Sequence, residues 1–401
     1  MTPWLTIVGV SLNGAASLGE AARKAIEEAH IVAGSERLLD LMEIAPERRL
    51  AWPSPLADGI RRLRDMAGQP VVVLATGDPM HFGIGATLAV ALASHEYNVL
   101  PAPSSLSLAA ARMGWALQDV ACISLHGRPL ERLHAALAPN TRLLLLTRDG
   151  AAPGEIMTLL SLAGYGKSRI SVLENLGGSD EARHTLTAAN YRPKEYAALN
   201  IVAVECIIDN TMAYLPPLPG LPDGALLHDG QLTKRDVRAV TVSALIPTPG
   251  ERLWDVGAGC GSIAIEWLRC ARSSTAVAFE RNEARLGMMR ENALRLGVPH
   301  LAIVAGAAPD CLRGHPTPDA VFLGGAISDA EVFKACWQAL RPGGRLVANA
   351  VTVEGCAALA ERHRALGGEL LQISISHARA VGKFHALKPA MAITQWRAIK
   401  P

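Results

Sequence analysis

The chain has 401 residues, roughly two to three times a typical domain, so we expect two domains, with one oversized barrel as the competing possibility. Half of the residues are hydrophobic, 4% are aromatic and 19% are charged. This composition indicates a soluble mixture of helices and strands and excludes a disordered or fibrous chain. The net charge of +2 excludes a whole-protein field that would attract nucleic acid or a membrane surface.

The sequence also indicates a compartment. The stretch 79–95 contains no Asp, Glu, Lys or Arg, and its 17 residues are too few to span a bilayer. No Lys or Arg precedes Arg23, so the basic start of a secretory signal is missing and we expect a cytoplasmic protein. The seven cysteines show no CxxC spacing and no nearby histidine cluster, so we expect neither disulfides nor a metal site.

Short aliphatic and β-branched runs alternate with helical patterns along the whole chain, which predicts a parallel α/β architecture. The strands expected in a first series are 5–10, 71–75, 143–147, 170–174 and 201–208. A second series is expected at 252–256, 276–280, 301–305, 320–323, 345–350, 370–376 and 391–397.

Four prolines in ten residues, 215–224, stand between the two series. Proline cannot donate to a sheet and stiffens the chain, so we predict a linker at 213–224 between domains 1–212 and 225–401. The division separates a net charge of −3 in the first part from +5 in the second. No acidic residue follows Glu369, so we expect a cationic end on the second domain.

The most specific local pattern follows the expected strand 252–256. Asp255 is followed by three alternating glycines and then by an apolar-periodic helix, and Glu280 ends the next strand. Glycines allow the backbone to turn sharply and approach a ligand, while an acid at the position of Glu280 accepts hydrogen bonds from ribose hydroxyls. The predicted cofactor contacts in this domain are Thr233, Asp255, Gly257, Ala258, Gly259, Cys260, Gly261, Glu280, Gly306 and Ala307.

Two cofactors compete for this loop. A dinucleotide requires GxGxxG, but here the third glycine comes one residue early and Ser262 takes its place. GxGxG after an acid favours S-adenosylmethionine, because the acid would repel a pyrophosphate. The sequence Thr233 to Asp236 is interpreted as a capping box that opens the preceding helix.

The first domain has its own candidate loops. Residues 76–85 come directly after a predicted buried strand, and α/β sheets bind ligands at the carboxyl ends of their strands. The run 101–105 leads into a predicted helix of small residues. Two further loops lie at 124–128 and 174–178. Each of the four loops could be a simple turn, but we do not expect turns alone to account for all four together.

This set resembles the tetrapyrrole methylase (class III) family, in particular the cobalamin-pathway branch that methylates C-5 of precorrin-6. The second half, with its glycine loop and the run 343–352, is similar to the decarboxylating C-15 methyltransferases of that pathway. The resemblance covers nearly the whole chain. It implies a two-lobed class III tetrapyrrole methylase fold, with lobes at about 1–112 and 113–212, joined to a Rossmann-like class I methyltransferase fold.

The resemblance also implies two S-adenosylmethionine sites, one in each domain. The first would be formed by Gly77, Asp78, Pro79, Phe82, Gly83, Ser104, Ser105, Leu146 and Thr147. The expected reaction is methylation of precorrin-6B at C-5 and C-15, with decarboxylation of the C-12 acetate to give precorrin-8. A cobalt-loaded substrate, a nucleotide-dependent oxidoreductase and a non-catalytic tetrapyrrole carrier stay open as alternatives.

A tetrapyrrole carries many carboxylates, so cationic side chains are expected around it. The candidates are His126 and Arg128 in the first domain, and Lys234, Arg238, Arg379, Lys383 and His385 in the second. Each of them can equally be part of a solvated basic surface. We expect no nucleic acid or membrane partner, since the first domain is acidic and aromatic residues are few, and we expect a homo-oligomer.

Overall fold

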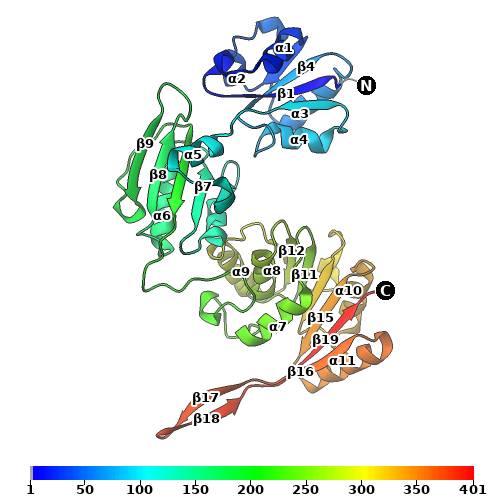
Figure 1. Cartoon of the computed structure of the whole chain (residues 1–401). Coiled ribbons are helices and arrows are strands. Elements are labelled where there is room, and N and C mark those ends of the chain that lie inside the picture. The colour runs from blue at the N-terminus through cyan, green and yellow to red at the C-terminus, as the bar shows by residue number, and fades with distance from the viewer. Residues whose placement is uncertain (1–2) are drawn as a thin grey trace. The chain divides into compact units, whose positions relative to one another are not determined.

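The computed structural model describes residues 3–401, and the chain divides into two compact units (Figure 1). The first unit comprises the residues up to 128 together with 138–212, and the second comprises Pro129–Leu137 together with Ala213–Pro401. Both units are α/β, as expected from the alternating pattern. No helix within residues 3–401 has the length and apolarity needed to cross a membrane.

The first unit begins with a five-stranded parallel sheet in the order β3-β2-β4-β1-β5. Its strands are β1 (Leu5–Val10), β2 (Ile31–Gly34), β3 (Arg49–Ala51), β4 (Val71–Thr76) and β5 (Tyr97–Leu100). The connecting helices are α1 (Glu20–Glu28), α2 (Glu36–Leu41), α3 (Leu56–Arg64) and α4 (Ile84–Ala91). The aliphatic side chains of β1 and β4 point alternately into two apolar clusters, because both faces of this sheet are covered.

The second sheet of this unit differs from the expected parallel arrangement. Its order is β6-β7-β10-β8-β9, and only β6 (Val120–Ser124) and β7 (Arg142–Leu146) are parallel. The strands β8 (Arg169–Glu174), β9 (Ala182–Thr187) and β10 (Asn200–Glu205) pair antiparallel. The prediction of parallel strands was wrong here, because only the connection between β7 and β8 carries a full helix, α6 (Ala152–Leu162).

The helix α5 (Ser105–Met113) packs on this second sheet, where Leu106 and Ala109 contact Leu144 and Ile201 in one apolar cluster. The expected lobe boundary at residue 112 would place α5 with the first sheet. The small apolar side chains of α5 suit either sheet, and only the packing assigns the helix.

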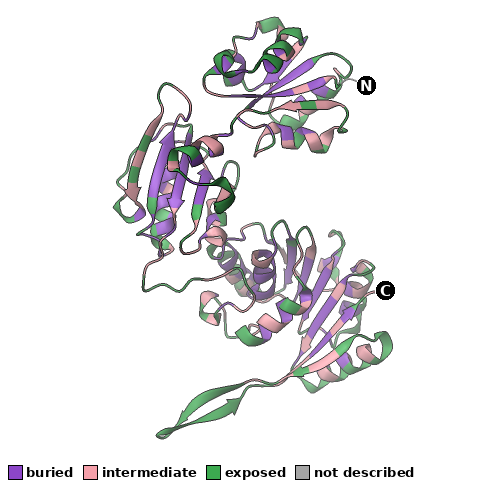
Figure 2. Cartoon of the chain, in the orientation of Figure 1, coloured by how far each residue is buried: buried purple, intermediate pink, exposed green. Residues whose placement is uncertain are grey.

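The second unit contains a seven-stranded sheet in the order β13-β12-β11-β14-β15-β19-β16. Its strands are β11 (Arg252–Val256), β12 (Thr275–Glu280), β13 (Ala302–Ala305), β14 (Ala320–Gly324), β15 (Arg345–Ala350), β16 (Glu369–Ile373) and β19 (Ile393–Ile399). All are parallel except β19. Figure 2 shows the buried centre of the unit, which is formed by the central strands β11, β12, β14 and β15.

Two layers of helices cover this sheet. The helices α7 (Arg235–Leu245), α8 (Ser262–Cys270) and α9 (Glu283–Arg295) contribute to the cluster on one face, where Trp267 is fully buried. The helices α10 (Ala330–Ala339) and α11 (Val353–Leu366) cover the other face, around Trp396. This arrangement confirms the Rossmann-like expectation and brings the ends of β11 and β12 to one edge of the sheet.

Two segments outside the main sheet also belong to the second unit. The proline-rich segment expected as a linker packs on it, since Leu221 is buried in the core and the carboxylate of Glu266 accepts from the backbone N–H of Gly220 and Leu221. The 3-10 helix Leu130–Ala136 contacts α9, where a Cβ added at Gly297 would clash with Ala135.

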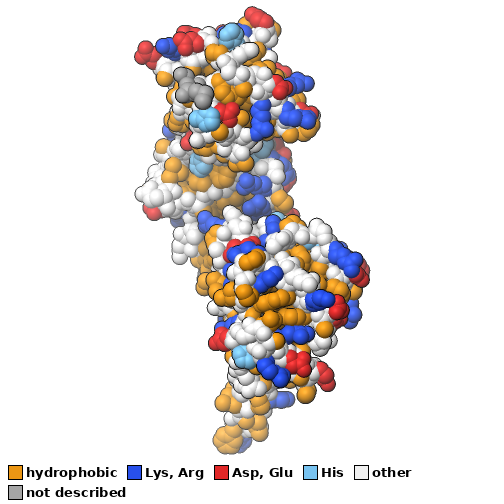
Figure 3. Space-filling view, turned by 90° about the vertical axis from the view of Figure 1, so that its right-hand side faces the viewer, with side chains coloured by type: hydrophobic (Ala, Val, Ile, Leu, Met, Phe, Trp, Pro, Cys, Tyr) orange, Lys and Arg blue, Asp and Glu red, His pale blue; other side chains and the backbone are white. Residues whose placement is uncertain are grey.

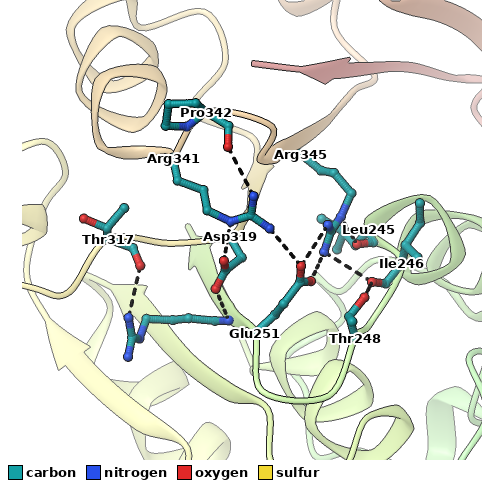
Figure 4. A network of polar contacts seen from close by, with 10 residues as sticks. Leu245, Ile246, Thr248, Glu251, Thr317, Asp319, Arg341, Pro342 and Arg345 are labelled. Atoms are coloured by element: carbon teal, nitrogen blue, oxygen red, sulfur yellow. Dashed lines mark hydrogen bonds and ion pairs between the residues drawn. The ribbon is translucent and has the colours of Figure 1, made fainter. Parts of the chain in front are cut away.

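The amino ends of the strands in this unit are tied together by charged side chains (Figure 4). Glu251, just before β11, pairs with Arg345 at the start of β15 and with Arg341 at 3.0 Å, and Arg341 also pairs with Asp319 before β14. This network lies at the edge opposite to the glycine loop, so it stabilises the sheet rather than forming part of a site.

A separate hairpin, β17 (Ser376–Val381) and β18 (Phe384–Pro389), connects β16 with β19. Every residue of both strands is exposed, and Figure 3 shows hydrophobic side chains at the end of the molecule where the hairpin lies. Because β16 is parallel to β15, the hairpin leaves the sheet at the carboxyl edge, the same edge as the glycine loop.

Candidate functional site

The glycine loop of the second unit has a backbone that only glycine adopts easily. Gly257, Gly259 and Gly261 have φ of 74°, 60° and 82°, and a Cβ at Gly261 would lie 2.6 Å from Met289. The backbone N–H groups of Gly257 and Ala258 donate to the carbonyl of Phe279 on β12. The loop is thus fixed at the carboxyl ends of β11 and β12.

Asp255 lies beneath this loop and is 1% exposed. Its Oδ2 accepts from the backbone N–H of Ala264 at 3.0 Å, while its Oδ1 has no hydrogen-bond partner. Burial raises the pKa of this carboxyl to about 7, and the nearby Glu280 adds to the rise. An unpaired buried oxygen is costly, so Asp255 is a group that a bound donor would stabilise.

Glu280 at the end of β12 holds the loop from the other side. Its Oε2 accepts from the backbone N–H of Gly259 at 2.8 Å, and its Oε1 accepts from Arg281 and Asn282, both at 2.9 Å. Oε2 retains a lone pair for a further donor, while Oε1 already accepts two hydrogen bonds. From the sequence we expected Glu280 to contact a ribose. In the structure its side chain also holds the backbone of the glycine loop through Gly259.

Two neighbouring segments flank the loop. The carbonyl of Gln231 lies 3.7 Å from the Cβ position of Gly259, which brings the segment before α7 against the glycine loop. Arg285 on α9 fixes this segment through Asp229 at 2.8 Å and Gln231 at 2.6 Å. On the other side, the N–H of Gly306 donates to the carbonyl of Glu280, which sets Ala307 beside β12.

The segment before α7 also corrects the expected capping box. The N-cap of α7 is Lys234, which provides no side-chain cap, and Thr233 lies one residue before it. Lys234 is exposed, with Nζ 3.4 Å from the carbonyl of Gly230, so it remains available at the same edge as the glycine loop.

Arg238, expected to bind substrate, is placed elsewhere. It is fully buried and donates to Glu266 at 2.6 Å, to Asp223 at 3.1 Å and to the carbonyls of Thr233 and Leu221. Its guanidinium therefore attaches the proline-rich segment to α7 and α8. We correct its assignment from a substrate ligand to a structural residue.

The hairpin separates the other expected cations. In an antiparallel pair, side chains directly opposite each other share a face and neighbours along a strand alternate. Arg379 pairs with Ala386, whereas His385 pairs with Ala380, so Arg379 and His385 point to opposite faces. Lys383 lies in the turn between the strands. The three side chains therefore do not form one cluster.

In the first unit, the loop after β4 packs on the start of α5. Gly77 has φ of 63°, and its Cβ position is 3.0 Å from Cα of Ser104. Ser104 is the N-cap of α5 and accepts from the N–H of Ser107, with Ser105 as the first helical residue. Gly83 and Pro79 close the loop, because a Cβ at Gly83 would lie 2.6 Å from the Pro79 carbonyl.

Phe82, like Met80, is an exposed side chain of this loop. It has φ of 57°, stacks on His81 with ring centroids 5.1 Å apart, and lies 5.9 Å from the Arg128 guanidinium carbon. The Nδ1 atom of His81 is 3.3 Å from Oγ of Ser104. The structure thus brings Arg128 to the loop of Asp78, while His126 is exposed two residues away.

The remaining expected contacts lie at the end of β7. Leu146 is half-buried and accepts from the N–H of Leu125 at 2.8 Å. The hydroxyl of Thr147 is 2.7 Å from Oδ1 and 2.8 Å from the carbonyl oxygen of Asn200. The hydroxyl proton of Thr147 is therefore used within this unit.

One residue of this edge was missed. Arg37 on α2 donates from Nη2 to the hydroxyl of Thr76 at 2.9 Å, directly before Gly77, and burial lowers the pKa of its guanidinium. Its place depends on the pairing of β2 with β4, so no local motif marks it.

The comparisons with known proteins agree with this division. The model of the tetrapyrrole (corrin/porphyrin) methylases matches residues 5–190, and that of the precorrin methyltransferase domain matches 224–400. A precorrin-6Y C(5,15)-methyltransferase (decarboxylating) of Sinorhizobium sp. is 46% identical over 99% of this chain and 96% of its own length. The protein of that name from Mycobacterium tuberculosis H37Rv is 38% identical over 99% of this chain and 100% of its own.

A shorter relative matches only part of the chain. The cobalt-precorrin-6B C(15)-methyltransferase (decarboxylating) of Salmonella typhimurium is 33% identical over 39% of this chain and 83% of its own length. Since the long relatives match end to end and both family models match in order, the chain belongs to the precorrin-6Y C(5,15)-methyltransferases, S-adenosylmethionine-dependent enzymes that join a tetrapyrrole methylase to a decarboxylating methyltransferase.

Proposed function

We propose that the chain methylates precorrin-6B at C-5 and C-15 and removes the C-12 acetate carboxyl as carbon dioxide, giving precorrin-8. The observation that supports this most directly is the glycine loop over Asp255, held by Glu280 at the carboxyl edge of the second unit. The names of the full-length relatives support the pair of reactions.

We propose two S-adenosylmethionine sites. In the second unit the residues fit this cofactor, since Asp255 presents an unpaired oxygen and the loop lacks the side chains that would fill its cradle. Glu280, Gly306 and Ala307 would flank the adenosine, and Thr233 with Lys234 the opposite side. In the first unit, the turn of Gly77 to Gly83 and the N-cap Ser104 would provide the corresponding backbone contacts.

When bound, S-adenosylmethionine supplies an electrophilic methyl group. The task of the protein is then to align the attacking carbon and exclude water, and such positioning can contribute roughly 7–11 kcal/mol. Neither a metal nor a covalent nucleophile is required for this step. Lys234, Arg128 and His126 are the cations we retain as carboxylate partners, with Arg379 and Lys383 on the hairpin as a second group and His385 on its other face.

Incubation with precorrin-6B and S-adenosylmethionine tests the function. Mass spectrometry should show the gain of two methyl groups and the loss of one carbon dioxide. The cobalt-loaded substrate, assayed in parallel, distinguishes the two substrate classes. Binding of NADH without S-adenosylmethionine would indicate an oxidoreductase, and binding of tetrapyrrole without methyl transfer would indicate a carrier.

Variants test the assignment of the two sites. Glu280→Gln should weaken S-adenosylmethionine binding at one of two calorimetric sites, because an amide has one acceptor oxygen for the N–H groups that Glu280 holds.

Arg128→Ala should abolish C-5 methylation and leave decarboxylation measurable. Equal loss of both activities in Arg128→Ala would contradict its placement at the first site.

A further inference from the structure

We propose that Asn349 donates a hydrogen bond to the substrate during the decarboxylating C-15 methylation, and that Thr241 and Gln395 are positioning residues that hold its carboxamide. This inference rests on the proposed function of the second unit. It comes from a hydrogen-bonded group of three neutral polar side chains at the edge of the sheet that also carries the glycine loop.

The position of Asn349 is set by strand pairing. It lies near the carboxyl end of β15, where its Cα pairs with that of Gly324 on β14. The carbonyl of Gly324 lies 3.1 Å from the Cβ position of Gly257 in the glycine loop. Asn349 is therefore two strands away from the cofactor loop, at the same edge, where an acceptor for the methyl group has room to lie.

The carboxamide of Asn349 is fixed by two side chains that are 0% exposed, Thr241 on α7 and Gln395 on β19. Its Nδ2 donates to Oγ1 of Thr241 at 2.9 Å, and its Oδ1 accepts from Nε2 of Gln395 at 2.8 Å. Nε2 of Gln395 also donates to Oγ1 of Thr241 at 3.1 Å. The second N–H of Asn349 has no acceptor within residues 3–401, and Asn349 itself is only half-buried.

The rest of the group is saturated. Oγ1 of Thr241 donates to the carbonyl of Val237 at 2.8 Å, and Oε1 of Gln395 accepts from Arg397 at 2.7 Å. A buried polar group costs free energy unless it is paired, and apolar side chains of the same size would fill this space without that cost. The unused N–H of Asn349 is the one part of the group that can reach a ligand.

A neutral donor suits the chemistry better than a cation. In the decarboxylation the bond between the methylene carbon and the carboxyl carbon breaks and carbon dioxide leaves. The electron pair stays on the methylene carbon, conjugated with the macrocycle, and one proton from water converts the methylene to a methyl group. A cation paired with the carboxylate would stabilise the negative charge of the ground state and so raise the barrier to decarboxylation. A neutral amide orients the carboxylate but stabilises its charge less.

The test uses the full chain, because C-5 methylation by the first unit is an internal reference. Asn349→Ala and Asn349→Asp should both lower kcat for carbon dioxide release by about 100-fold, the loss expected for one donor to a reacting group. Asn349→Asp keeps an oxygen for Gln395 but has no N–H. Gln372→Ala is the matched control, since Gln372 is an exposed carboxamide on β16 at the same edge, outside the group.

The positioning residues have their own variants. Thr241→Val removes the oxygen that accepts from Asn349 and Gln395. It should lower kcat for carbon dioxide release about 10-fold without changing KM for S-adenosylmethionine. Thr241→Ser keeps this oxygen and should retain the wild-type kcat. A purely structural Thr241 would instead change the melting temperature, with no rescue specific to carbon dioxide release. Unchanged carbon dioxide release in both Asn349 variants would overturn the inference. A wild-type chain that never releases carbon dioxide would overturn the proposed function instead.

Discussion

At the scale of single residues, Asp255 is a buried carboxyl that costs the fold stability. The carboxyl is buried with one oxygen unpaired, and burial raises its pKa to about 7. The buried carboxyl is therefore unfavourable for stability, which supports our proposal that a ligand binds at the loop above it.

Asp255→Asn should remove a pH-dependent loss of stability. Because the folded state keeps its proton up to about pH 7 while the unfolded state loses it near pH 4, this group lowers the free energy of unfolding as pH rises between those values. The slope is at most about 1.4 kcal/mol per pH unit. Denaturant unfolding of the second unit should be measured from pH 4 to 8. The free energy of unfolding of Asp255→Asn should rise relative to that of the wild type as the pH increases.

The control for this prediction is Asp236→Asn, since Asp236 is an exposed acid in the first turn of α7. Its curve should run parallel to that of the wild type. Parallel curves for Asp255→Asn as well would contradict a raised pKa.

At the scale of elements, the glycine loop depends on backbone conformation as much as on space. Gly261→Ala would place a Cβ at φ of 82° and 2.6 Å from Met289, so we expect a loss of about 1–3 kcal/mol in the stability of the second unit. The matched control is Gly287→Ala inside α9, where nothing lies within 4 Å of the added Cβ. That change should stabilise by about 0.5–1 kcal/mol.

Thermal unfolding followed by calorimetry measures both glycine variants. S-adenosylmethionine binding to the second unit should weaken in Gly261→Ala and stay unchanged in Gly287→Ala. Equal effects of the two substitutions would indicate that the loop tolerates a side chain.

The opposite edge of the sheet depends on charge (Figure 4). Burial opposes ionisation of Glu251, but hydrogen bonds and the charge of Arg345 outweigh it, so the pKa of Glu251 is lowered. Ionised Glu251 therefore stabilises the fold above its ordinary pKa, and this stability is lost as the pH falls through the lowered value. Glu251→Gln should destabilise the second unit at pH 7 and flatten its loss of stability in acid.

Unfolding curves at pH 7 and at a pH below the lowered pKa of Glu251 separate the two effects. The wild type and Glu251→Gln should converge in acid, because the wild-type carboxyl is then neutral. A constant difference at all pH values would mean that shape rather than charge explains the effect.

At the scale of the whole molecule, the two units are not simple halves of the chain. Pro129–Leu137 lies within the sequence of the first unit but belongs to the second, and Leu133 in this segment is fully buried. The domain boundary near residue 212 remains our proposal, with this segment as an exception to it.

Leu133→Ala should therefore destabilise the second unit more than the first. A cavity from a buried leucine costs about 2–5 kcal/mol. After heating, the Leu133→Ala chain should retain less of its carbon dioxide release than the wild type, while it should retain as much of its C-5 methylation. Leu162→Ala, at an exposed leucine of α6, is the control. Greater loss of C-5 methylation would place the segment with the first unit.

Much of this architecture was predictable from local signals. The glycines after Asp255 are required by the backbone itself, and Glu280 follows at the end of the next strand, so strand, loop and helix could be recognised in order. The hairpin was missed because every residue of its strands is exposed and no apolar face marks them in the sequence. The antiparallel second sheet was missed because aliphatic runs carry no direction.

The sequence by itself determined the glycine loop of the second unit, the loop after β4 and the family, because all of these depend on residues that are close along the chain. Tertiary structure alone decided the partners of distant side chains. It buried Arg238 against Glu266, put Arg379 and His385 on opposite faces of the hairpin, and joined Thr241, Asn349 and Gln395 across 154 positions of sequence. The reason is physical: burial and strand register arise only when segments far apart in the chain pack together.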